Sequence, residues 1–177
     1  MSYNRFYSLT AAIVLLLTTL AIPRASHAQA EVYGEFSITD LHNAFTTDLL
    51  YGATTGVLID GPTFHRIVLS GDIQGRFVRK SGESMNGLTV GPRFSVAMKH
   101  GIVPYAEFMI GFARYNDPTN QGDTTDSTFQ VNAGVGKRIS PRFDLVADYS
   151  YSQYYALDGQ FNPKTFSIGT IFHFNKR

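Results

Sequence analysis

The chain has 177 residues, no cysteine and a formal net charge of +1. The lack of cysteine excludes disulfide bonds and thiolate chemistry. The near balance of acidic and basic residues leaves no basic excess with which a nucleic acid could be bound, so no nucleic-acid partner is expected.

The first thirty residues have the pattern of an export signal. Arg5 precedes an apolar run from Leu9 to Ile22, and small residues follow it up to Ala28-Gln29-Ala30. The run is shorter than the ~20 residues that a membrane-spanning helix needs, and the small residues are typical of a signal-peptide cleavage site. We therefore expect a cleaved secretory signal peptide over 1–30, cut after Ala28 or Ala30, and one domain over 31–177. An uncleaved membrane anchor is the alternative.

Beyond the signal, apolar and polar residues alternate with the two-residue period of a β-strand. In the segment 142–155, Phe143 and Leu145 fall on one face while Asp144 and Asp148 fall on the other. Similar alternation predicts eight strands, over roughly 31–39, 49–59, 64–79, 87–99, 102–115, 127–139, 142–155 and 164–174. Eight is an even number that can close a small barrel. Pro92 lies inside the fourth segment, where we expect a local break in pairing.

The connections between these segments alternate in length. Longer ones are expected at 40–48, 80–86, 116–126 and 156–163, and shorter ones at 60–63, 100–101 and 140–141. This asymmetry favours an all-β, eight-stranded antiparallel up-and-down transmembrane β-barrel, with long loops at one end and tight turns at the other. Aromatic residues should form a girdle near each end: Tyr51, Tyr115, Tyr149, Tyr151 and Tyr155 at the long-loop end, and Phe64, Tyr105, Phe143, Phe172 and Phe174 at the other.

The last predicted strand carries a local motif, in which Gly169, Phe172 and Phe174 have glycine-x-x-aromatic-x-aromatic spacing. With the strand layout, it resembles the OmpA-like, or OmpX-type, family of eight-stranded outer-membrane barrels, and the resemblance covers the whole chain after the signal. It implies residence in the bacterial, Gram-negative outer membrane, contact with its lipid, and recognition of the three motif residues by the barrel assembly machinery. The sequence departs from the family at Ile168, where a polar residue is preferred, and in the three residues that follow Phe174.

If the polar faces point inward, both signs of charge share one narrow interior. An eight-stranded barrel is only wide enough for its own side chains, so we expect these groups to form a salt-bridged network that plugs it. The predicted network contains Glu35, Asp72, Arg76, Arg93, Lys99, Glu107, Arg138, Arg142, Asp144 and Asp148.

A small barrel with a plugged interior is expected to act as a structural or surface-interaction protein, with a partner outside the cell at its four extracellular loops. A narrow channel or transporter is one alternative, and it would need a continuous water path. A soluble periplasmic ligand-binding barrel is another, and it would need an apolar interior and a polar exterior.

No catalytic residue, cofactor site or metal site is predicted, so the protein is not expected to be an enzyme. The deacylase among eight-stranded barrels uses a His-x-Ser pair, and none of His42, His65, His100 or His173 is followed by serine two positions later. The oxygen-rich segment 116–126 lacks the spacing of a calcium-binding loop. Its residues are ordinary turn formers, which favours a solvated loop.

Overall fold

The computed structural model describes residues 29–41, 49–116, 124–156 and 159–174. Nearly all of them lie in β-strands, with one short 3₁₀ turn, η1 (Lys99–Gly101). The strands are β1 (Ala30–Asp40), β2 (Leu49–Phe64), β3 (Ile67–Lys80), β4 (Glu83–Val96), β5 (Ile102–Asn116), β6 (Thr124–Ser140), β7 (Phe143–Ala156), β8 (Gly159–Phe161) and β9 (Lys164–His173). No helix in this part of the chain is long and apolar enough to cross a membrane.

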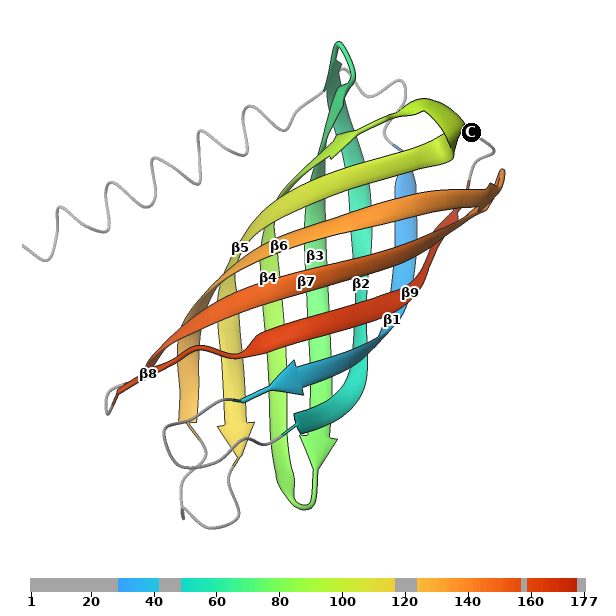
Figure 1. Cartoon of the computed structure of the whole chain (residues 1–177). Helices are drawn as coiled ribbons and strands as arrows, with labels where there is room; N and C mark the ends of the chain where they lie inside the picture. The colour runs from blue at the N-terminus through green and yellow to red at the C-terminus, as the bar shows by residue number, and fades with distance from the viewer. Residues whose placement is uncertain (1–28, 42–48, 117–123, 157–158, 175–177) are drawn as a thin grey trace, which may run out of the picture.

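The strands close into a barrel in which every neighbouring pair is antiparallel (Figure 1). β1 pairs with β2 on one side and with β9 on the other, so the sheet has no free edge between its first and last strands. The three-residue β8 and the longer β9 both pair with β7, with only Asn162 and Pro163 between them. They therefore form one interrupted strand, and the predicted eight-stranded antiparallel barrel is confirmed.

Side chains alternate between the outer and inner surfaces, as the two-residue period predicted. The inner surface is mainly polar, and Thr54 and Ser167 are completely buried there. The outer surface is apolar, and Phe77 and Leu88 are 55% and 62% exposed. This arrangement has an apolar outside and a polar inside, which excludes a soluble barrel with an apolar interior.

Two predicted connections are wrong. The turn between β2 and β3 is His65–Arg66, and β2 runs on through 60–63 with a register shift there. The expected long loop 80–86 is a two-residue turn, Ser81–Gly82, in which both residues have positive φ (49° and 97°). Such turns match the twist of a β-hairpin, and the residues after Gly82 are consequently in β4.

The expected break at Pro92 is present as a gap in one ladder. Between β4 and β5 the pairs Val90–Ile110 and Arg93–Glu107 share one register, but Gly91 and Pro92 between them make no pair. On its other side β4 pairs with β3 without interruption. The proline, which has no N–H to donate, is thus accommodated without breaking the strand.

The two ends of the barrel differ, and each is named by its connections. The loop rim is the end at which 41–48, 81–82, 117–123 and the β7–β9 connection lie. The turn rim is the opposite end, with the connections 65–66, 97–101 and 141–142. β1 begins and β9 ends at the turn rim, which is uppermost in Figure 1.

Candidate functional site

The interior of the barrel is filled by layers of side chains, which follow one another along each strand. From the loop rim to the turn rim, β7 contributes Tyr154, then Ser152 and Ser150, then Asp148, Val146 and Asp144, all buried. β1 and the residue that follows it have a similar order, with Leu41, then Thr39 and Ser37, then Glu35, Tyr33 and Glu31, all buried. The packing of these layers decides whether a solute can pass through the barrel or bind inside it.

The centre of the barrel is a carboxylate layer, formed by Glu35, Asp72, Glu107 and Asp148 around Arg93. Two tyrosines hold two of these acids. The Tyr33 hydroxyl lies 3.1 Å from both Asp72 oxygens, and the Tyr105 hydroxyl donates to Asp148 Oδ2 at 3.1 Å. Hydrogen bonds to a charged acceptor are among the stronger ones in proteins, so each tyrosine fixes the carboxylate that it faces.

Each tyrosine crosses a glycine to reach its aspartate. A Cβ added at Gly56 would lie 2.4 Å from the Tyr33 hydroxyl, and one added at Gly134 would lie 2.4 Å from Tyr105 Cζ. Because those distances are shorter than any real contact, neither glycine can carry a side chain while the ring lies over it. The glycines on β2 and β6 thus make room for tyrosines from β1 and β5.

Glu107 is fully partnered by its two cross-strand neighbours. Arg93 on β4 and Asn132 on β6 both lie directly opposite it. Arg93 Nη1 is 3.4 Å from Glu107 Oε1, and Asn132 Nδ2 donates to Glu107 Oε2 at 2.6 Å. The Arg93 guanidinium also stacks 3.5 Å from the centroid of the Tyr105 ring, a cation–π contact that suits a planar guanidinium.

Glu35 occupies the matching place on β1 but lacks such partners. Its cross-strand neighbours are Gly169 on β9 and Thr54 on β2. Within the described residues its Oε2 atom is buried without a hydrogen-bond partner, and the partner of its carboxyl group is another acid, Asp148, to which it is hydrogen-bonded. The two halves of the carboxylate layer are therefore unequal, because one glutamate is paired with an arginine and the other with a second carboxyl group.

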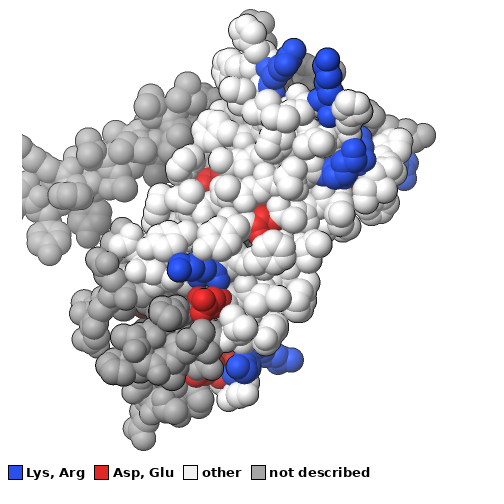
Figure 2. Space-filling model, in the orientation of Figure 1, with Lys and Arg blue, Asp and Glu red and all other residues white. Residues whose placement is uncertain are grey.

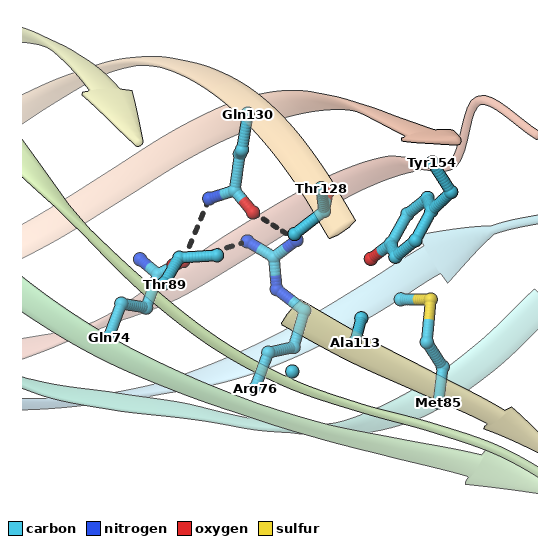
Figure 3. Close-up of a pocket in the computed structure, with 9 residues that line it drawn as sticks. Gln74, Arg76, Met85, Thr89, Ala113, Thr128, Gln130 and Tyr154 are labelled. Carbon is cyan, nitrogen blue, oxygen red and sulfur yellow. Dashed lines mark hydrogen bonds between the residues drawn. The ribbon is translucent and has the colours of Figure 1, made fainter. Parts of the chain in front are cut away.

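Arg76 forms a second hub, on the loop-rim side of the carboxylate layer. Its guanidinium lies between neutral acceptors, with Ser150 Oγ at 3.0 Å, Thr54 Oγ1 and Thr165 Oγ1 at 3.2 Å, and Gln130 Oε1 at 3.3 Å. Figure 3 shows Arg76 between Gln74 and Gln130, which are themselves joined at 2.8 Å. The hub links side chains from five strands across the whole width of the barrel.

An apolar layer closes the interior next to the loop rim. It consists of Leu41, Leu50, Val78, Met85, Ala113 and Tyr154, with Tyr115 packed against it. Figure 3 shows Tyr154 and Met85 facing each other beside the Arg76 hub. The cavity between this layer and the hub has a volume of about 10 Å³, which is room for about one water molecule.

A charged cluster lies at the turn rim, beyond a smaller apolar group of Leu58, Val146 and Ile171. His173 Nδ1 is 2.8 Å from Glu31 Oε1, and His173 Nε2 is 3.1 Å from Asp144 Oδ2. Arg138 Nε lies 3.3 Å from the other oxygen of Asp144. The adjoining cavity has a volume of about 30 Å³ and reaches inward to Arg93.

The structure places most of the predicted network residues inside the barrel and two outside. Seven are buried there: Glu35, Asp72, Arg76, Arg93, Glu107, Asp144 and Asp148. Arg138 is at the interior rim with one third of its side chain exposed. Lys99 and Arg142 were predicted wrongly, because the strand alternation was extended into turns where both side chains are exposed.

The alternation also hid several interior residues. Tyr105 and Tyr115 were expected in the aromatic girdles, yet they point inward with Tyr33. A repeated sequence could have revealed the two buried tyrosines, since Tyr33-Gly34-Glu35-Phe36 on β1 matches Tyr105-Ala106-Glu107-Phe108 on β5. In both copies the tyrosine lies opposite a glycine and the glutamate follows two positions later.

Removing either tyrosine hydroxyl should destabilise the barrel. We expect Tyr33→Phe and Tyr105→Phe each to lower the free energy of unfolding by about 2 kcal/mol, because each leaves a buried aspartate without its hydroxyl donor. Urea titration of the refolded protein measures this difference. Tyr149→Phe on the outer surface is the matched control, and an equal loss there would show that the buried hydrogen bonds are not the cause.

The motif of the last strand contributes to the wall rather than to the interior. Phe172 and Phe174 lie on the outer surface with their rings 5.3 Å apart, and Phe143 lies 5.2 Å from Phe172. Gly169 lies in the seam between β9 and β1, where a Cβ would come within 2.1 Å of the Gly34 carbonyl oxygen. Close packing against the β1 backbone therefore favours a glycine at this position, independently of any role in assembly.

The described residues contain no group of three or more His, Asp or Glu side chains that could hold a metal ion. His173 is buried in the turn-rim cluster, while His65 and His100 are exposed in turns. His42 lies outside the described residues, as does much of the segment 116–126.

The sequence matches the family model of the outer membrane protein beta-barrel domain over residues 10–174. The fold is similar to Neisserial surface protein A, with a TM-score of 0.66 and 12% identity over 82% of this chain and 97% of that chain. It is similar to Ail, the attachment invasion locus protein of Yersinia pestis, with a TM-score of 0.52 and 14% identity over 83% of this chain and 97% of that chain. It is also similar to the outer membrane enzyme PagL, with a TM-score of 0.53 and 14% identity over 80% of this chain and 98% of that chain. At these identities the likeness shows the fold alone, and no curated protein sequence matches the chain.

Proposed function

Because this chain belongs to the outer membrane protein β-barrel family, we propose that it is a closed barrel that holds its loops at the cell surface for structural or interaction purposes. Membership of this family confirms the predicted location in the bacterial outer membrane, where the barrel is in contact with lipid. The loop rim then faces outward from the cell, as is usual when tight turns are periplasmic. One of the four expected loops is the two-residue turn Ser81–Gly82, so the remaining three connections carry the interactions.

The observation that carries this proposal is the filling of the interior. The loop-rim apolar layer, the Arg76 hub and the carboxylate layer lie in series across the barrel, and the two cavities beside them hold about 10 and 30 Å³. Volumes of this size fit one or two water molecules. A small solute would have to displace ion pairs and hydrogen bonds that span several strands, which supports a plug rather than a channel.

Conductance in a planar bilayer tests the plug against the narrow-channel alternative. We expect the refolded protein to insert without discrete current steps, while the triple variant Leu50→Ala, Met85→Ala, Tyr154→Ala, which removes most of the loop-rim apolar layer, should show more leakage. Steps of uniform size from the unaltered protein would contradict the closed barrel. An epitope inserted in 117–123 should be detected on intact cells, and its detection only after lysis would contradict the proposed orientation.

A non-enzymatic role is part of the same proposal. The fold is shared with non-enzymatic barrels and with the enzyme PagL, so fold alone does not decide. What supports the proposal is the position of the described histidines, since His173 is held inside the turn-rim cluster and His65 and His100 lie in turns away from the loop rim. No described histidine lies with a serine two positions beyond it.

Biogenesis completes the proposal. We place a cleaved signal peptide at 1–30, which lies almost wholly outside the described residues, and the barrel domain at 31–177. Gly169, Phe172 and Phe174 would be read by the barrel assembly machinery. The exposure of Phe174, at 55%, supports this by leaving its ring available for contact.

A further inference from the structure

The outer surface of the turn rim carries positive charge only, within the described part of the chain. Four cations are exposed there: Arg66, Lys99, Lys137 and Arg142. The acids at the same end, Glu31, Asp60 and Asp144, face the interior cavity. Figure 2 shows Lys and Arg side chains gathered at the upper end of the molecule, without acidic side chains beside them.

Each of the three turns at this rim has the same composition, an exposed cation between two exposed apolar side chains. Arg66 lies between Phe64 and Ile67, which are 59% and 44% exposed. The other two turns repeat this, with Lys99 between Met98 and Ile102, and Arg142 between Ile139 and Phe143. Apolar groups that face acyl chains beside cations at headgroup depth form the arrangement by which proteins bind a charged membrane interface.

The loop rim has four exposed cations, Arg79, Lys80, Arg114 and Lys164, and two of them lie directly opposite acids. Lys80 lies directly opposite Glu83, and Lys164 lies directly opposite Asp40. By contrast, Lys137 at the turn rim lies between Ile102 and Leu145, and its ammonium group donates to the His100 carbonyl oxygen and not to an acid. Acids therefore lie opposite cations at the loop rim, whereas the described acids of the turn rim face the interior and leave the outer cations there without an acid opposite them.

We propose that the turn rim binds the phosphate groups of anionic phospholipids in the leaflet that surrounds it. Three turns spread the cations around the barrel, so that several headgroups are bound at once, and each apolar pair holds the acyl chains of the lipid next to its cation. Lys and Arg near an anionic surface each contribute a fewfold gain in binding. The inference goes beyond the proposed function and does not depend on which side of the membrane the turns face.

Lipid retention measures this binding. The full-length protein is refolded into nanodiscs of equal parts phosphatidylglycerol and phosphatidylcholine, which have acyl chains of the same length. The discs are opened with mild detergent and the lipids that stay bound are counted by native mass spectrometry. We expect the protein to retain phosphatidylglycerol about fivefold over phosphatidylcholine, and this preference to fall as salt is raised.

Two variants with the same change of charge separate the turn rim from general electrostatics. The turn-rim variant carries Arg66→Gln, Lys99→Gln, Lys137→Gln and Arg142→Gln, and its preference should fall to about one. The loop-rim variant carries Arg79→Gln, Lys80→Gln, Arg114→Gln and Lys164→Gln, and it should lose no more than about twofold. A turn-rim variant that keeps the preference, or equal losses in both, would overturn the inference.

The folding of each variant is checked by comparing the electrophoretic mobility of unboiled and boiled samples. Should the fourfold turn-rim variant fail to fold, the single variants Lys99→Gln and Arg142→Gln each should lower the preference about twofold. A preference unchanged in both single variants also overturns the inference. None of these outcomes depends on conductance or on surface exposure of the loops, so failure here is distinct from failure of the proposed function.

Discussion

Replacing Glu35 with glutamine should stabilise the barrel, which is an unusual sign for a change at a buried position. Glu35 Oε2 is buried without a hydrogen-bond partner among the described residues, and the carboxyl group is hydrogen-bonded only to another acid, Asp148. Glutamine has nearly the same shape, carries no charge, and brings a donor that a neighbouring carboxylate can accept. We expect the free energy of unfolding to rise by about 1 kcal/mol, since two neighbouring buried carboxyl groups repel each other, whereas an amide can donate to the Asp148 carboxylate without a charge of its own.

Glu107→Gln is the matched change, and it should have the opposite sign. Its partner Arg93 is buried, lies 3.4 Å from Glu107 Oε1 and keeps its charge when the glutamate is neutralised. Breaking a buried ion pair from one side costs about 3 kcal/mol or more, and Glu107 is the acid that forms the ion pair with Arg93. The free energy of unfolding should therefore fall by that amount.

Urea titration in one detergent or lipid, with the unboiled and boiled bands used to follow folding, measures both variants against the unaltered protein. The two substitutions remove the same charge from the same layer, so any general effect of lowering negative charge is common to them. Destabilisation by both would mean that Glu35 has a partner which compensates it. Stabilisation by both would mean that the layer carries too much negative charge regardless of pairing.

The wall of the barrel was predictable because a two-residue period survives in every strand. Once Phe77 and Leu88 point outward, Asp72, Gln74 and Thr89 on the same two strands must point inward. Closure into eight strands followed from the count of segments. The polar character of the inner face, and seven of the charged residues on it, could therefore be assigned without coordinates.

The interior contacts were not predictable from alternation, for two reasons. Inward positions also hold apolar residues such as Leu50 and Met85. An assignment that places every apolar residue on the outer face and every polar residue on the inner face puts these residues on the wrong face. Partner choice also depends on the register and tilt of strands far apart in sequence. Arg76, for example, meets Gln130 and Thr165 on strands that its own strand does not touch.

The turns were the least predictable part, because turn-forming residues can also be built into a strand. Asp60-Gly61-Pro62-Thr63 forms an irregularity in β2 instead of a turn, and the chain reverses two residues later at His65, where φ is 57°. The predicted strand 87–99 likewise runs past the real end of β4 at Val96, so that Lys99 was assigned to the interior although it lies in the turn. Side chains near strand ends consequently need the real turn position before their face is known.

Gly169→Ala should prevent normal closure of the barrel or weaken it by about 3 kcal/mol or more. The added Cβ would lie 2.1 Å from the Gly34 carbonyl oxygen and 2.5 Å from Glu35 Cα. Both are backbone atoms of β1, so relief requires the β1–β9 seam to open, and overpacking against backbone is among the more costly core changes. Refolding into detergent, followed by the heat-dependent band shift, measures the effect.

Gly34→Ala is the control on the other side of the same seam, since a Cβ there would meet nothing within 4 Å. It should refold like the unaltered protein. Detergent refolding takes place without the assembly machinery, so the pair also separates the two roles of Gly169. If Gly169→Ala refolds normally in detergent but fails to assemble in cells, recognition by the machinery is the reason for the glycine. If refolding fails in detergent as well, packing against β1 requires it, and Phe172 and Phe174 then remain as the residues through which a recognition signal must be tested.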